Sequence, residues 1–122
     1  MAALTSAGMS AYSASSAPVR PAFDRTHVGI GGSRHVHNGG HATLTVHLVD
    51  TTAHQPVHAK VTLWMRANRN HAWEKVATRI TGTDGRASAQ VRQFGSAWYQ
   101  WRYAGNSRHL PANSVLRHVV AH

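Results

Sequence analysis

The chain has 122 residues, no cysteine and a formal net charge of +9, from 13 Lys and Arg against 4 Asp and Glu. This length suits one domain, and the lack of cysteine excludes a disulfide framework and thiolate chemistry. No run of about 20 apolar residues occurs, so we expect no transmembrane segment. The excess of positive charge favours polyanionic partners.

The N-terminal segment differs in composition from the rest of the chain. Residues 1–17 carry no charge and are rich in Ala and Ser, which cannot form a core. The small residues 13–17 before Pro18 resemble the end of a secretory signal peptide, although the positive region that begins such peptides is missing. A truncated export signal and a plain linker both explain this segment. We expect a disordered tail over 1–25 and a folded domain over 26–122, in a secreted or cell-surface protein.

Seven segments alternate apolar and polar residues, as half-buried β-strands do. Turn-forming Gly, Asn, Asp and Pro residues separate them. Seven short strands with regularly spaced turns favour an all-β, antiparallel, immunoglobulin-like β-sandwich, with a small β-barrel as the alternative. The expected strands cover residues 26–30 (an edge strand), 41–50, 57–66, 73–82, 86–93, 96–105 and 114–121.

The sixth expected strand supplies the largest side chains of the core. Tyr99, Trp101 and Tyr103 share one face at period 2, and Gln100 and Arg102 lie on the other. Smaller apolar residues of the other strands complete the inward face. They are Ala42, Leu44, Val46, Leu48, Ala59, Val61, Leu63, Met65, Val76, Thr78, Ile80, Ala87, Ala89 and Val91.

The Asp84-Gly85 turn predicts a hairpin between the fourth and fifth strands, because this dipeptide tolerates the backbone twist of a tight connection. The third and fourth strands have two open alternatives. They either pair as a hairpin or lie in different sheets.

Several phrases occur in a characteristic order between His35 and Ala121. They are Gly39-Gly40, Gln55-Pro56-Val57 before Lys60-Val61-Thr62-Leu63-Trp64, Trp73 to Thr78, Thr83-Asp84-Gly85-Arg86, and Trp98 to Gly105 before His109 to Ser114. In this order they resemble the bacterial immunoglobulin-like repeats of exported proteins from high-GC Gram-positive bacteria. The resemblance implies a non-catalytic β-sandwich that serves as a spacer, stalk or adhesion module, often in tandem.

The chain departs from that family pattern in three respects. His54 stands where a turn Gly is usual, and Asn106 stands where an Asp is usual. The second departure removes a carboxylate from any cation site at that loop. Only one repeat is present, which weakens the implication of a tandem stalk.

No catalytic constellation is evident from the residues themselves. The carboxylates of Asp24, Asp50, Glu74 and Asp84 lie in four different parts of the expected fold, whereas acid/base pairs need two carboxyls in one cleft. A Gly-x-Ser-x-Gly elbow and a phosphate-binding loop are both missing. We therefore expect a protein that is not an enzyme and that needs no cofactor.

The cluster of His35, His37 and His41 is the candidate metal site. In an extended segment the first two imidazoles point to the same side, and the intervening Gly-Gly turn can bring the third back toward them. Three imidazoles suit zinc, nickel or copper. The alternative is a set of solvated surface histidines.

Outward residues of the third and sixth strands form the candidate binding surface. In an immunoglobulin-like fold these strands are antiparallel neighbours, which brings Trp64 near Trp98 and Lys60 near Arg102 beside Arg66. Indoles can stack on sugar rings while cations hold phosphate or carboxylate groups. This pattern indicates an anionic cell-wall polymer or polysaccharide as the partner, and no specific nucleic acid. The alternative is ordinary packing, in which an arginine stacks on an indole.

Overall fold

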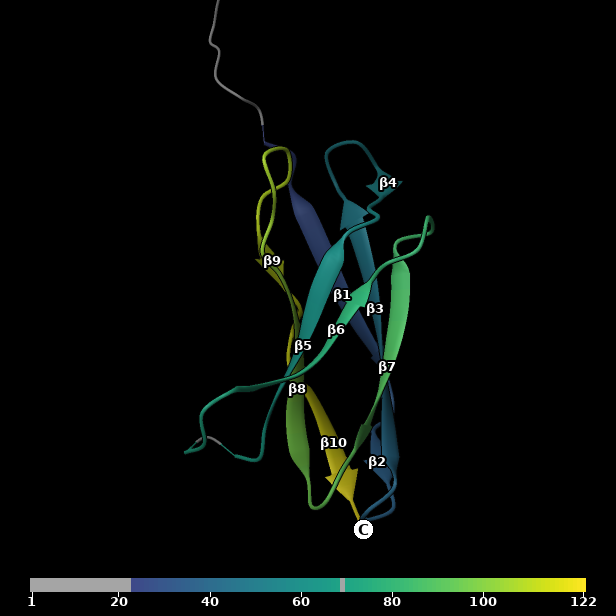
Figure 1. Ribbon diagram of the computed structural model, residues 1–122, viewed down its shortest axis with the longest axis vertical. Coiled ribbons are helices and arrows are strands. Elements are labelled where there is room, and N and C mark those ends of the chain that lie inside the picture. The colour runs from purple at the N-terminus through teal and green to yellow at the C-terminus, as the bar shows by residue number, and fades with distance from the viewer. Residues whose placement is uncertain (1–22, 69) are drawn as a thin grey trace, which may run out of the picture.

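The computed structural model describes residues 23–68 and 70–122 (Figure 1). The expected tail lies outside the described residues as far as position 22, but Asp24 is part of the fold. Its N–H donates to Arg108 O over 2.9 Å, and its carbonyl accepts the Leu110 N–H at the same distance. The described chain contains no helix, and hence none long and apolar enough to cross a membrane.

The described residues form ten β-strands, and seven of them correspond to the expected segments. The other three, β2, β4 and β9, have two residues each and lie between the expected strands. The strands are β1 (Thr26–Gly32), β2 (His35–Val36), β3 (His41–Asp50), β4 (Gln55–Pro56), β5 (Lys60–Arg66), β6 (Glu74–Ile80), β7 (Arg86–Arg92), β8 (Ala97–Tyr103), β9 (Ala112–Asn113) and β10 (Arg117–Ala121).

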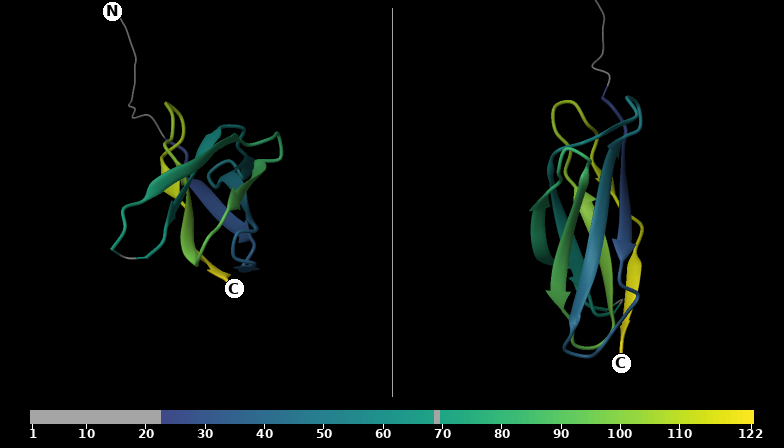
Figure 2. Two further views of the ribbon diagram at one scale, coloured as in Figure 1. Left: turned by 60° about the horizontal axis from the view of Figure 1, so that its bottom comes forward. Right: turned by 90° about the vertical axis from the view of Figure 1, so that its right-hand side faces the viewer.

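The strands form two sheets that pack against each other (Figures 1 and 2). In the four-stranded sheet, β3 lies between β1 on one side and β7 with the short β4 on the other. The six-stranded sheet has the order β2-β10-β8-β5-β6, and β9 also pairs with β8. Strands β2 and β10 are parallel, and the other strand pairs are antiparallel. Apolar side chains from both sheets share one core, so the architecture is that of a β-sandwich.

The alternation in β8 and β3 is confirmed by burial. Tyr99, Trp101 and Tyr103 are buried, whereas the residues between them are only half-buried. All four expected inward residues of β3 are buried as well. The aromatic side of β8 therefore belongs to the core, where each large ring buries more apolar area than an aliphatic side chain does.

The polar groups of these core aromatics have different surroundings. The Tyr99 hydroxyl donates to Gln93 Oε1 over 2.8 Å, and the Gln93 amide donates to Val119 O at the same distance. By contrast, Trp101 Nε1 and the Tyr103 hydroxyl are buried without a hydrogen-bond partner among the described residues. Of these three aromatic residues, only Tyr99 therefore has a hydrogen-bond partner for its polar side-chain group among the described residues.

The expected hairpin between β6 and β7 is wrong, because the two strands belong to different sheets. The tight turn is present, and Gly85 adopts the positive φ of 77° that glycine tolerates. Before the turn, the Thr81 N–H donates over 2.9 Å to the carbonyl of Ala59, the residue that directly precedes β5. After it, the Gly85 carbonyl accepts the Leu48 N–H of β3 over 2.8 Å. These contacts tie the two sides of the turn to opposite sheets.

The inward face expected for β6 is also wrong in part. Thr78 is exposed and Ile80 is 65% exposed, whereas Val76 and its neighbour Ala77 are both half-buried and pack on the core. A register shift after Leu63 in the pairing with β5 interrupts the strict alternation. Of the two alternatives for the third and fourth strands, the structure shows the hairpin, with β6 at the edge of the sheet.

Replacing each buried tyrosine by phenylalanine tests the difference in their polar surroundings. Tyr99→Phe leaves Gln93 Oε1 without its donor in the core, so we expect the free energy of unfolding to fall by about 1–3 kcal/mol. Tyr103→Phe removes a hydroxyl that has no partner, so we expect no loss. Urea denaturation measures both changes, and an equal loss in the two variants would contradict the assignment.

Alkaline stability provides a second readout of the same substitution. Burial raises the pKa of Tyr99 to about 12, from an ordinary value of 10.0. Above the ordinary value the unfolded chain loses this proton while the folded chain keeps it, so the stability from Tyr99 is full at lower pH and falls as the pH rises. We expect Tyr99→Phe to flatten this decline. An unchanged slope would assign the decline to other groups.

Candidate functional site

The outer face of the six-stranded sheet carries the residues expected to bind a ligand. Strands β5 and β8 are antiparallel neighbours, as predicted. Trp64 lies opposite Gln100, and Arg66 lies opposite Trp98, so the two indoles are diagonal neighbours. Lys60 stands at the exposed start of β5 and makes no cation–π contact among the described residues.

Two arginines and two indoles on this face stack in alternation. The guanidinium carbon of Arg102 lies 4.6 Å from the centre of the Trp64 ring and 5.3 Å from that of Trp73. The guanidinium carbon of Arg66 lies 4.6 Å from the same Trp73 ring. Attraction between a cation and the negative face of an aromatic ring favours this arrangement. We refer to Trp64, Arg66, Trp73, Trp98 and Arg102 as the tryptophan–arginine face.

Trp73 is the member of this face that sequence reasoning missed. It directly precedes β6, and the pairing of β5 with β6 returns it to the side of Arg66. A signal was available, because a hairpin between these two strands places the residues at the ends of its loop side by side.

Hydrogen bonds and stacking hold the face in place. Trp64 Nε1 donates to Thr62 Oγ1 over 2.9 Å, and Arg102 Nε donates to Gln100 Oε1 over 3.0 Å. The Trp98 ring stacks on His118, with 4.3 Å between ring centres and 19° between planes. The alternative of ordinary packing predicts that an arginine stacks on an indole, and the structure shows this contact for both Arg66 and Arg102. The face is therefore an ordered layer of side chains.

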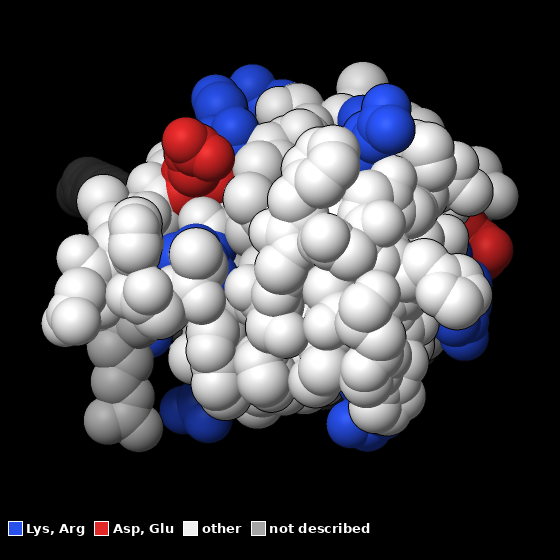
Figure 3. All heavy atoms as spheres, turned by 90° about the horizontal axis from the view of Figure 1, so that it is seen from below, with Lys and Arg blue, Asp and Glu red and all other residues white. Residues whose placement is uncertain are grey.

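The positive charge of the protein is not neutralised internally. Within residues 23–68 and 70–122, the one ion pair joins His109 to Asp50, and no Lys or Arg pairs with a carboxylate. Seen from the lower end, basic side chains are spread around the rim and acidic ones are sparse (Figure 3). On the tryptophan–arginine face, Arg66 Nε is buried without a hydrogen-bond partner in that part of the chain. The charges of the arginines on this face are therefore not neutralised by any carboxylate of the described chain.

The structure does not gather His35, His37 and His41 into a metal site. His35 belongs to β2 in the six-stranded sheet, and His41 begins β3 in the other sheet. The turn between them is held by the residue that follows β7, since the Gly39 N–H donates to Gln93 O over 2.7 Å. His35 instead stacks on His122, with 3.3 Å between ring nitrogens. In the described chain, the one group of three potential metal ligands within 4.8 Å of one another lies elsewhere.

That group consists of Asp24, Asp50 and His109, at the end of the sandwich where β1 begins and β3 ends (top of Figure 1). The expectation that the carboxylates lie apart is wrong for this pair. Strand β1 pairs antiparallel with β3, so the residues before β1 lie beside the end of β3. A backbone bridge between Asp24 and His109 adds the loop that follows β8. The sequence did hold a signal for this meeting. The first two expected strands can form an antiparallel pair, which places the residues before the first strand beside the end of the second.

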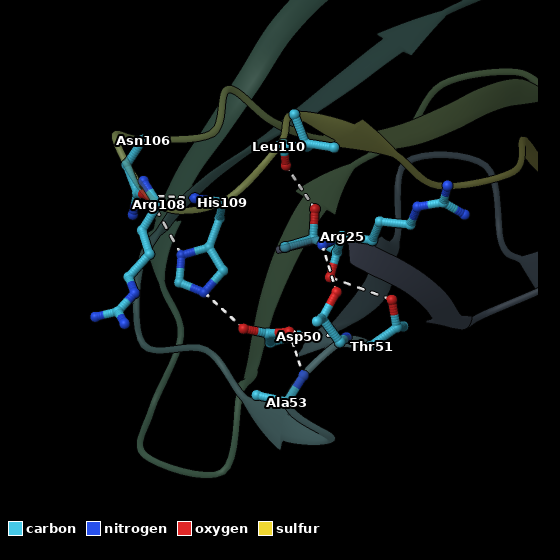
Figure 4. Close-up of polar contacts among 10 residues, drawn as sticks. Arg25, Asp50, Thr51, Ala53, Asn106, Arg108, His109 and Leu110 are labelled. Carbon is cyan, nitrogen blue, oxygen red and sulfur yellow. Dashed lines mark hydrogen bonds and ion pairs between the residues drawn. The ribbon is translucent and has the colours of Figure 1, made fainter. Parts of the chain in front are cut away.

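Asp50 is the best-anchored member of the cluster, at 4% exposure. Its Oδ1 accepts the Thr52 and Ala53 N–H groups over 2.9 and 2.8 Å, and its Oδ2 lies 3.1 Å from His109 Nε2. Figure 4 shows the His109 ring between Asp50 and Asn106. The other ring nitrogen, Nδ1, lies 3.3 Å from Asn106 Oδ1. Both sides of the imidazole therefore face oxygen atoms.

The two carboxyl groups have opposite pKa shifts. A hydrogen bond with Asp50 raises the pKa of Asp24, and burial adds to the increase. Burial alone would raise the pKa of Asp50, but hydrogen bonds from the Ala53 N–H, Asp24, His109 and the Thr52 N–H outweigh it and lower the pKa. The surroundings therefore favour the ionised form of Asp50 and disfavour that of Asp24.

A cavity of about 350 Å³ opens beside the cluster. Its lining includes all three members of the cluster together with His58, Asn106 and Arg108. In Figure 4 the Arg108 guanidinium points away from the His109 ring. The cluster is thus accessible from solvent and has no basic side chain in ion-pair contact among the described residues other than His109 itself.

No protein family, curated protein or solved structure matches the chain.

Alanine substitutions should separate the roles of the two carboxylates. Asp50→Ala removes the acceptor of two backbone N–H groups, and its lowered pKa means that the lost stability is present at neutral pH and disappears as the pH falls below about 3.8. Asp24 has a raised pKa, so its ionised form opposes folding at neutral pH. We expect Asp50→Ala to lower the urea midpoint far more than Asp24→Ala. The reverse order would contradict this assignment of roles.

Proposed function

We propose that the chain is a non-catalytic surface-interaction domain of an exported protein, with an immunoglobulin-like β-sandwich. In that fold, strands A, B and E share one sheet and strands C, F and G share the other, with C′ beside C in some members. Strands β1, β3 and β7 correspond to the first three, β5, β8 and β10 to the second three, and β6 to C′. Export is supported by the signal-like small residues at 13–17 and by the family resemblance.

Within this function, we assign binding of an anionic saccharide polymer to the tryptophan–arginine face. The observation that carries the assignment is that Arg66 and Arg102 stack on indoles while no carboxylate pairs with them in the described chain. A guanidinium already held in place loses little freedom on binding, and its planar fork matches carboxylate and phosphate groups. The neighbouring indoles offer apolar surface to sugar rings, and the net charge of +9 attracts the polymer.

Charge-matched double variants test this assignment by retention on purified Gram-positive cell wall. Arg66→Gln with Arg102→Gln should weaken retention about tenfold or more, because the removed contacts are charge-assisted. Arg34→Gln with Arg86→Gln removes the same charge from exposed positions outside the face and should change retention little.

A third variant, Trp64→Ala with Trp98→Ala, keeps the charge and tests the indoles. It should also lose retention while its circular dichroism spectrum stays that of the folded protein. Equal losses in the two arginine double variants, abolished alike by moderate salt, would leave only diffuse charge attraction.

A further inference from the structure

The cluster of Asp24, Asp50 and His109 lies apart from the tryptophan–arginine face and joins three distant parts of the sequence. Two carboxylate oxygens and one imidazole nitrogen lie within 4.8 Å of one another. A zinc-class ion bonds such donors at about 2.0–2.2 Å, so two donors of one ion lie at most about 4.4 Å apart. Small side-chain rotations therefore bring this cluster to coordination distance.

The imidazole is oriented as a ligand by Asn106. Asn106 Oδ1 accepts the Arg108 and His109 N–H groups over 2.8 Å each, which identifies this atom as the oxygen of the amide. His109 Nδ1 lies 3.3 Å from the same oxygen, which accepts a hydrogen from a donor at that position. The other ring nitrogen, Nε2, points toward Asp50 Oδ2, 3.1 Å away. Histidines that bind metals are commonly fixed in this way through the second nitrogen.

Charge and access favour a bound cation at the same point. Without a cation, a hydrogen on His109 Nε2 can bridge to Asp50 Oδ2, and a bound metal ion would take the place of that hydrogen. The chain has many arginines, but none pairs with either carboxylate in the described residues, and Arg108 on the cavity wall points away from the His109 ring (Figure 4). The cavity of about 350 Å³ gives an ion and its waters a route to the three donors.

We propose that Asp24, Asp50 and His109 bind a divalent cation of the zinc class, with water completing its coordination. Imidazole nitrogen favours zinc, cobalt, nickel and copper over calcium and magnesium. Calcium takes six to eight oxygen ligands, which is more than two aspartates provide without many waters. Asn106 holds His109 in place and is not itself a ligand, so the missing carboxylate at position 106 does not weaken this site.

Binding of the ion would fasten the lead-in to β1 onto the end of the sandwich. Asp24 precedes β1, Asp50 ends β3, and His109 lies between β8 and β9. One ion therefore cross-links both sheets and the segment by which the chain enters the fold. Because the ion binds only the folded arrangement, it should raise the melting temperature, and the increase should follow the logarithm of the ion concentration once the site is saturated.

Calorimetric titration of the chelator-treated full chain with Zn²⁺ alone tests the proposal. We expect one-to-one binding at micromolar or tighter affinity, weakened at least about tenfold in both Asp24→Asn and His109→Gln, since each removes one ligand bond. Neither substitution removes Asp50 Oδ1, the side-chain oxygen that accepts two backbone N–H groups, so both variants should stay folded. Zn²⁺ should also raise the melting temperature of the parent chain and have less effect on the two variants.

The other histidines and acids supply the controls. His35→Gln disrupts the close pair of imidazoles formed by His35 and His122, and Glu74→Gln removes a carboxylate that does not belong to the cluster. Both should retain the one-to-one phase. Loss of one-to-one binding in His35→Gln, with retention in His109→Gln, would place the ion at the His35 and His122 pair and overturn the proposal. Ca²⁺ affinity equal to that of Zn²⁺, or no one-to-one phase in the parent, would also overturn it.

Discussion

Burial of the β8 aromatic side chains between the two sheets is the interaction on which the rest of the structure depends. Tyr99 and Trp101 are fully buried, and β8 lies inside its sheet with β10 and β9 on one side and β5 on the other. Since side chains alternate along a strand, fixing these rings inward also fixes Trp98 and Arg102 outward. The core and the tryptophan–arginine face are therefore two sides of one strand.

The scarcity of carboxylates shapes the surface. Of the four acids, Asp24 and Asp50 meet at one end of the sandwich, and Asp84 accepts the Arg86 N–H in its own turn. Few acids are left to pair with the basic side chains, and in the described chain none does. An arginine without an acidic partner can still be ordered by an aromatic ring, as Arg66 is by Trp73. The result is a cationic surface that is structured and yet not neutralised.

Sequence periodicity predicted the local structure because alternation records which side of each strand is buried. The bounds of β3 agree exactly with the expected segment 41–50, and the rings of β8 face inward as expected. Alternation fails at β6, where a register shift in the pairing with β5 leaves Ile80 outside the core. A strand at the edge of a sheet has only one neighbour to enforce its pattern.

Partnerships between distant segments could not be predicted in the same way. An Asp-Gly turn indicates a reversal of the chain but not which sheet receives the next strand, and the contacts of Thr81 and Gly85 decide that. The meeting of Asp24 with His109 likewise depends on a backbone bridge between segments 85 positions apart, which no local pattern records. The His35 to His41 cluster shows the converse, because proximity in sequence did not bring its imidazoles together.

The central claim is that polyanions bind the tryptophan–arginine face, and the indole N–H resonances of the four tryptophans report on it directly. Trp101 lies in the core and serves as an internal reference, whereas Trp64, Trp73 and Trp98 belong to the face. Titrating the ¹⁵N-labelled protein with polygalacturonate should shift these three resonances and leave that of Trp101 in place. Unchanged indole resonances, with shifts confined to backbone amides of β1 and β3, would contradict the account.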